Sequence, residues 1–144
     1  SEIMSKKMFQ ELYVPYYKRV NGWVHENTSW KTLFHTCGSL VNILDDFVDC
    51  GLDCLNPIQT SADGMDPEYL KGKYNKELVF WGGGVDSQTT ITHGTPDDVE
   101  KEMRKRIEIF GKDGGFVFSV VHNIQDNVDL KNVQRILDVL KEYR

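Results

Sequence analysis

The sequence is poor in cysteine, has no excess of basic residues and contains no long apolar run. Its three cysteines are an odd number, which argues against a disulfide scaffold and favours a reducing, cytoplasmic location. The net charge of -5 argues against a broad basic face for nucleic acid or an anionic membrane. No apolar stretch approaches the roughly 20 residues that cross a bilayer, and the charged start does not resemble a signal peptide. We therefore expect neither nucleic acid nor a membrane as a partner.

The composition that remains is that of an ordinary globular protein, with 40% apolar and 27% charged residues. A chain of 144 residues is long enough to build one hydrophobic core. We find no internal repeat, low-complexity segment or linker, so the sequence predicts a single domain over residues 1–144.

The hydrophobic pattern predicts one helix followed by four strand–helix units. The first helix covers residues 3–26 and is kinked or broken near Pro15. Strands are predicted over residues 31–36, 52–56, 78–81 and 115–121, and the helices that follow them over 39–51, 66–74, 95–111 and 129–140. Apolar strands that alternate with helices indicate an α/β protein with a parallel sheet.

Two architectures fit this order, a small doubly wound sheet and half of an eight-stranded (β/α) barrel. Polar or glycine-rich segments follow all four predicted strands, at residues 35–38, 56–59, 82–88 and 122–125. A barrel brings the end of every strand to one common mouth, whereas a doubly wound sheet concentrates its ligand residues at one switch point. The sequence therefore favours the half-barrel.

His35 and Cys37 are the candidate metal ligands in the first of these segments. In an extended segment they point to the same face, and zinc accepts both imidazole and thiolate. The alternative is a partly buried imidazole beside an inert thiol. Cys50 and Cys54 could form another metal pair, but small buried thiols beside Gly51 are the better interpretation.

The other polar residues at the strand ends have two interpretations each. Asp86 could orient a ligand, support a metal or cap a turn. Five amides could bind substrate or anchor loops: Asn56, Gln59, Gln88, Asn123 and Gln125. Residues 82–84 are glycines that would let the backbone approach a large planar ligand. Trp23, Trp30 and Trp81 are expected in the core, and His25 at the surface or in a loop.

Several motifs of the chain resemble the uroporphyrinogen decarboxylase superfamily. The residues that carry the resemblance are Phe34–Ser39, Leu55–Gln59, Gly64–Pro67, Phe80–Gln88, Gly94–Pro96, Gly114–Phe116 and His122–Gln125. The resemblance implies a TIM (β/α)8 barrel of roughly twice this length. This chain would form its carboxyl-terminal half.

The resemblance also implies one of two chemistries. One branch transfers methyl groups between a corrinoid and a thiol, with zinc held by a His-x-Cys pair and a later cysteine. His35 and Cys37 match the pair, and His122 stands where the later cysteine would be. This branch implies zinc on His35, Cys37 and His122, catalytic roles for Asp86 and His122, and the five amides as substrate-binding residues. The other branch decarboxylates uroporphyrinogen without a cofactor, and Cys37 favours the first branch over it.

The same reasoning predicts the partners. Methyl transfer implies a corrinoid as methyl donor or acceptor, and possible contact with a corrinoid protein. A half-barrel leaves two apolar sheet edges, which invite pairing with an amino-terminal half-barrel or with a second copy. A third hypothesis is a non-catalytic half-barrel that binds or assembles without turnover.

Overall fold

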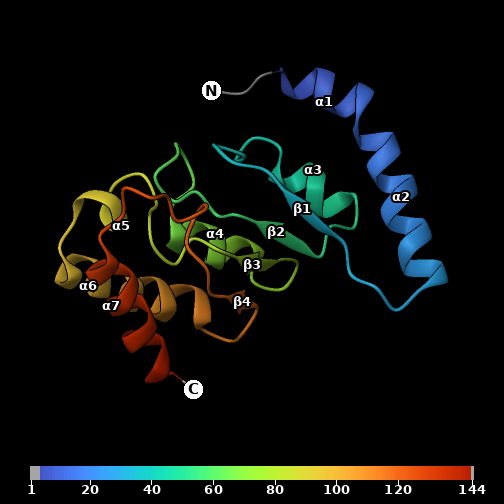
Figure 1. The fold of residues 1–144 in the computed structure, drawn as a ribbon. Helices are drawn as coiled ribbons and strands as arrows, with labels where there is room; N and C mark the ends of the chain where they lie inside the picture. The colour runs from blue at the N-terminus through green and yellow to red at the C-terminus, as the bar shows by residue number, and fades with distance from the viewer. Residues whose placement is uncertain (1–3, 144) are drawn as a thin grey trace.

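The computed structural model describes residues 4–143 and shows an α/β fold (Figure 1). Its elements follow the predicted order, with one additional short helix, α5. They are α1 (Lys6–Leu12), α2 (Val14–Asn27), β1 (Leu33–His35), α3 (Leu44–Asp49), β2 (Cys54–Asn56), α4 (Pro67–Tyr74), β3 (Val79–Trp81), α5 (Thr90–His93), α6 (Pro96–Gly111), β4 (Phe116–Val117) and α7 (Leu130–Lys141). Among the described residues, no helix has the length and apolar character that a membrane span requires.

The four strands form one parallel sheet in the order β1-β2-β3-β4. Phe34 pairs with Leu55, Leu55 with Phe80, and Phe80 with Phe116. Each strand therefore lies beside the next strand of the chain, as consecutive strands of a (β/α) barrel do. A doubly wound sheet would reverse the order at a switch point, so the topology agrees with part of a barrel.

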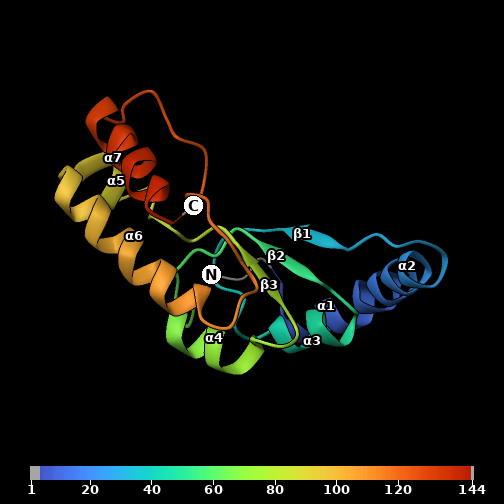
Figure 2. The same ribbon diagram turned by 90° about the horizontal axis from the view of Figure 1, so that it is seen from below.

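One face of the sheet is covered and the other is open. The row Phe34, Leu55, Phe80 and Phe116 belongs to the main hydrophobic core. Helices α3 and α4 lie on that side of the sheet, and no helix of the described chain lies over β1 and β2 on the opposite side (Figure 2). A second core joins α5, α6 and α7.

The predicted helix starts are confirmed at three places. Asp66, Thr95 and Asp129 each accept a hydrogen bond from a backbone N–H of the first turn of their helix. The long amino-terminal helix is broken as predicted, but the break lies at Tyr13. Pro15 sits in the first turn of α2, where its missing N–H costs nothing. The predicted residue 3 lies outside the described part of the chain.

The predicted helix start at Ser39 is wrong. Helix α3 begins at Leu44, and the Ser39 hydroxyl instead donates to the carbonyl of Asp63. The predicted fourth strand is also too long, since β4 covers only Phe116 and Val117. Beyond it, the Gly84 N–H still donates to the Ser119 carbonyl at 2.9 Å, so the chain continues alongside β3 without a regular ladder.

The three tryptophans do not lie in the core, contrary to expectation. Trp23, Trp30 and Trp81 are 61%, 71% and 41% exposed. Trp81 pairs with Val117 on the open side of the sheet, and Val117 is exposed as well. Trp23 lies on an exposed side of α2, and Trp30 lies between α2 and β1.

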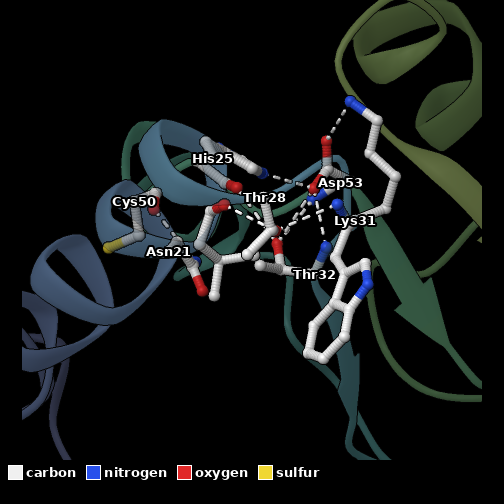
Figure 3. A network of polar contacts seen from close by, with 10 residues as sticks. Asn21, His25, Thr28, Lys31, Thr32, Cys50 and Asp53 are labelled. Atoms are coloured by element: carbon white, nitrogen blue, oxygen red, sulfur yellow. Dashed lines mark hydrogen bonds and ion pairs between the residues drawn. The ribbon is translucent and has the colours of Figure 1, made fainter.

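Asp53 ties α2 to the amino end of the sheet (Figure 3). Its Oδ2 lies 2.7 Å from Nε2 of His25 and accepts the Thr32 N–H at 2.7 Å, and Lys31 Nζ lies 3.3 Å from Oδ1. His25 therefore lies at the surface, one of the two places expected for it, on α2 rather than in a loop and with a carboxylate partner. Burial raises the pKa of Asp53, but the bonds from Thr32, His25 and Lys31 outweigh burial and bring it from 3.8 to about 2.

Candidate functional site

A cavity of about 450 Å³ lies at the carboxyl ends of the strands. Its lining comes from the segments that follow all four strands: Cys37, Gln59, Ser87, Gln88, Val121, His122, Asn123 and Gln125. Its volume is within the usual range for small-molecule sites. Six of these residues were singled out in the sequence: Cys37, Gln59, Gln88, His122, Asn123 and Gln125. They converge at one mouth because the strands are parallel and lie in chain order.

Cys37 is the accessible thiol of this cavity. It is exposed, whereas Cys50 and Cys54 are buried, as the sequence predicted for these two. Burial raises the pKa of the Cys50 and Cys54 thiols, which makes them less reactive. Cys37 and His122 line the same cavity, one after the first strand and the other after the last.

His35 and Asn56 lie together on the neighbouring strands β1 and β2, and neither is among the residues that line the cavity. Nδ1 of His35 is 2.6 Å from Oδ1 of Asn56, and the Asn56 amide donates to the Trp81 carbonyl at 3.1 Å. An amide oxygen only accepts, so the His35 Nδ1–H is the donor. This bond fixes the imidazole and leaves Nε2 as the nitrogen available to a ligand.

The predicted zinc ligands do not form a metal centre as they lie. Within residues 4–143, no group of three or more His, Cys, Asp or Glu side chains is arranged to hold a metal ion. Cys37 and His122 share the cavity, whereas His35 contacts Asn56. Zinc binding by His35, Cys37 and His122 stays a prediction.

Gln59 combines the two roles considered for the amides. Its Oε1 accepts the Gly38 N–H at 2.8 Å and so holds the loop that carries Cys37. The same side chain lines the cavity. Gln88, Asn123 and Gln125 also line the cavity and are the amides placed to meet a substrate there.

Asp86 stabilises the loop that carries Ser87 and Gln88. It is 4% exposed, and its Oδ1 accepts the backbone N–H groups of Gln88 and Thr89, both at 2.8 Å. Burial raises the pKa of this carboxyl, but hydrogen bonds from Ser61, Thr89 and Gln88 lower it overall, so Asp86 stays ionised. The observed contacts are those of a turn cap, and a catalytic role stays a prediction.

The glycine run 82–84 serves the packing of loops. A Cβ on Gly83 would lie 2.8 Å from the Ile58 carbonyl oxygen, and a Cβ on Gly84 would lie 2.3 Å from the Phe118 ring. These glycines let β3 and its loop approach the segments after β2 and β4. The large planar ligand expected there is therefore not needed to explain them.

Ser87 is a lining residue that the sequence reasoning missed. It lies between Asp86 and Gln88, which were both singled out. Its place in the polar, glycine-rich segment 82–88 that follows β3 was the signal that could have found it.

Comparisons with known proteins identify the family and the fold of this chain. The family model "Uroporphyrinogen decarboxylase (URO-D)" matches residues 1–143. The uroporphyrinogen decarboxylase of Chlorobaculum tepidum is 28% identical over 145 residues, which cover 96% of this chain and 38% of that protein. Methylcobamide:CoM methyltransferase MtbA of Methanosarcina mazei is 22% identical over 143 residues, which cover 99% of this chain and 39% of that protein.

A solved structure shares the fold. A methyltransferase from Methanosarcina mazei has a TM-score of 0.74 at 22% identity, over 97% of this chain and 38% of its own. The chain thus spans about two fifths of the length of the relatives it matches. Since the family model covers nearly every residue, the chain belongs to the uroporphyrinogen decarboxylase (URO-D) family.

Proposed function

We propose that this chain supplies part of the active site of a methyltransferase that moves a methyl group between a corrinoid and a thiol. The observation that carries the proposal is the exposed Cys37 thiol, which lines one cavity together with His122. The similarity to MtbA over 99% of the chain supports it, because the name of that protein gives methylcobamide and CoM as its substrates.

The cavity residues have separate tasks in this reaction. Transfer to a thiol would form a carbon–sulfur bond and leave the electron pair of the broken cobalt–carbon bond on cobalt, so the thiol substrate would have to lose its proton. His122 is the imidazole that lines the cavity and would take that proton. Gln88, Asn123 and Gln125 would hold the polar end of the thiol substrate by amide hydrogen bonds.

Zinc is the metal that this chemistry would use, because bound zinc ionises a thiol at neutral pH. The described side chains do not fit the ion as they lie, since no three-ligand group is present within residues 4–143. The methyl-transfer proposal therefore rests on the cavity, and the metal content of the protein is a separate measurement.

Decarboxylation of uroporphyrinogen is the second candidate. The relative from Chlorobaculum tepidum, a uroporphyrinogen decarboxylase, is more similar to this chain than MtbA is, at 28% against 22% identity. In this case the same amides would donate to the carboxylates of the tetrapyrrole.

Either reaction requires more of the barrel than this chain contains. The chain covers 38% of its decarboxylase relative and 39% of its methyltransferase relative. We therefore propose that an amino-terminal half-barrel or a second copy completes the site, and that a corrinoid protein docks at the shared mouth during methyl transfer.

The test compares two activities on the protein that contains this chain. Loss of methyl from methylcobalamin in the presence of a thiol is followed by absorbance, and decarboxylated porphyrinogens are separated by chromatography. Methyl loss that falls in Cys37→Ser but not in Cys50→Ala, the matched control at a buried thiol, would support methyl transfer. Decarboxylation without methyl loss would establish the second candidate instead. Zinc measured by elemental analysis, lowered by Cys37→Ser, would assign the metal to this site.

A further inference from the structure

A second cavity, of about 310 Å³, lies between the amino-terminal helices and the segment that follows β1. Its aromatic walls are Phe9, Tyr13, Tyr17, Phe34 and Phe47. These rings come from α1, the α1–α2 break, α2, β1 and α3. The volume is at the small end of the range for ligand sites, and an apolar, aromatic lining is typical of them.

The aromatic walls are held in place by one another. The ring centroids of Phe34 and Phe47 are 4.8 Å apart, those of Phe9 and Phe47 are 5.1 Å apart, and those of Tyr17 and Phe34 are 5.3 Å apart. Tyr13, at the break between α1 and α2, stacks on Phe9 at 6.0 Å and on Tyr17 at 6.5 Å, and the rings of Phe9 and Tyr17 are 6.1 Å apart. Because the rings that wall the cavity contact one another, the cavity is preformed. A ligand would therefore bind with little free-energy cost for ordering the lining side chains.

The described lining of this cavity is uncharged. Among residues 4–143, none of those that line it is Asp, Glu, Lys, Arg or His. The Lys6–Asp46 ion pair and the Gln10–Asp46 hydrogen bond lie on the same helices but outside the lining. Burial raises the pKa of the Tyr17 hydroxyl, so it stays neutral at physiological pH. A charged ligand would find no opposite charge here to offset its loss of water.

We infer that this cavity binds a neutral, ring-bearing small molecule, with its apolar ring against the aromatic walls. Tyr13, Tyr17 and Thr36 are lining residues that carry a hydroxyl group, which could bond one polar substituent of the ligand. Cys37 lines both this cavity and the one at the strand ends, so an occupant would lie against its thiol. The inference is independent of the proposed methyl transfer.

The probe for the test is N-phenyl-1-naphthylamine, a neutral two-ring fluorophore whose emission rises in an apolar site. Ile43→Trp places a larger side chain in the cavity lining. Val117→Trp is the matched control, because it adds the same side chain on the open face of the sheet, where an unspecific probe would also bind. We expect saturable binding that Ile43→Trp weakens by about tenfold or more, a change of 1.4 kcal/mol, while Val117→Trp leaves it unchanged.

Alkylation of Cys37 gives a second readout that needs no variant. After treatment with a chelator, the bound probe should slow the reaction of N-ethylmaleimide with Cys37, followed by intact mass. Cys50 and Cys54 are buried and should stay unlabelled in the folded protein. Absence of saturable binding, equal weakening by both Trp variants, or binding that leaves the Cys37 rate unchanged would each overturn the inference. A cavity already filled by another part of the protein would give the first of these results.

Discussion

The Asp53 network predicts a defined change in stability with pH. Its folded pKa of about 2 lies nearly two units below the ordinary value of 3.8. One unit corresponds to about 1.4 kcal/mol, so the ionised carboxylate stabilises the folded chain by about 2 kcal/mol. Because the folded pKa is depressed, this stabilisation is present in full above about pH 4 and is lost as the pH falls towards about 2.

The variant Asp53→Asn tests this directly. It removes the charge and keeps the shape, so at pH 6 we expect the free energy of unfolding to fall by about 2 kcal/mol. The difference between wild type and variant should shrink as the pH is lowered through 4 and 3, because the wild-type carboxyl then takes up a proton. Urea unfolding followed by circular dichroism at each pH measures both quantities.

The matched control is Asp138→Asn. Asp138 is an exposed carboxylate on α7 that pairs with Lys141, within the same helix, and such surface pairs contribute little. Its variant should keep nearly the full wild-type stability at pH 6. The reasoning about Asp53 would be refuted if Asp53→Asn were as stable as Asp138→Asn, or if its stability changed with pH as the wild type does.

Three further predictions concern the core, a glycine and the thiols. Asn132→Ala should cost about 1–3 kcal/mol in thermal unfolding, because the buried amide donates to the carbonyls of Ile91 and Gly94 at 2.9 Å each; an unchanged melting temperature would contradict this. Gly83→Ala should destabilise by about 1 kcal/mol or more in urea, since its φ is +79° and a Cβ would meet Ile58; Gly72→Ala, where a Cβ meets nothing within 4 Å, is the control. A folded sample should take up one maleimide, at Cys37, and an unfolded one three, as read by intact mass; rapid labelling of Cys50 would count against the buried assignment.

The sequence predicted the topology well because each signal for it is local. Apolar strands and capped helices can each be recognised from consecutive residues. The helix starts Asp66-Pro67 and Thr95-Pro96 are examples. Once the strands are parallel and adjacent, their ends must meet. The convergence of Cys37, Gln88 and His122 on one cavity therefore follows from pattern alone.

What the sequence missed depends on contacts between distant segments. Ser39 carries the signal of a helix cap, but its hydroxyl bonds a carbonyl 24 residues away. His25 meets Asp53, 28 residues further along the chain. The aromatic cavity likewise needs Phe9, Phe34 and Phe47 from three elements. No periodicity reveals such pairings, because each is chosen by tertiary packing.

Trp81 was expected in the core but is exposed, and this exposure bears on the proposal that another half-barrel or a second copy completes the site. Tryptophan is apolar enough for a core, but β3 places Trp81 beside Val117, on the face of the sheet opposite the row of Phe80 and Phe116, and both side chains are exposed there. Leu33 is also exposed on the first strand, so apolar side chains lie open at both edges of this sheet. Exposed apolar faces and unpaired strand edges are unfavourable in water and invite association. The relatives have more than half of their length outside the matched region, which is enough chain to cover such a face. We propose that the amino-terminal half-barrel or second copy that completes the site also covers Trp81 and Val117.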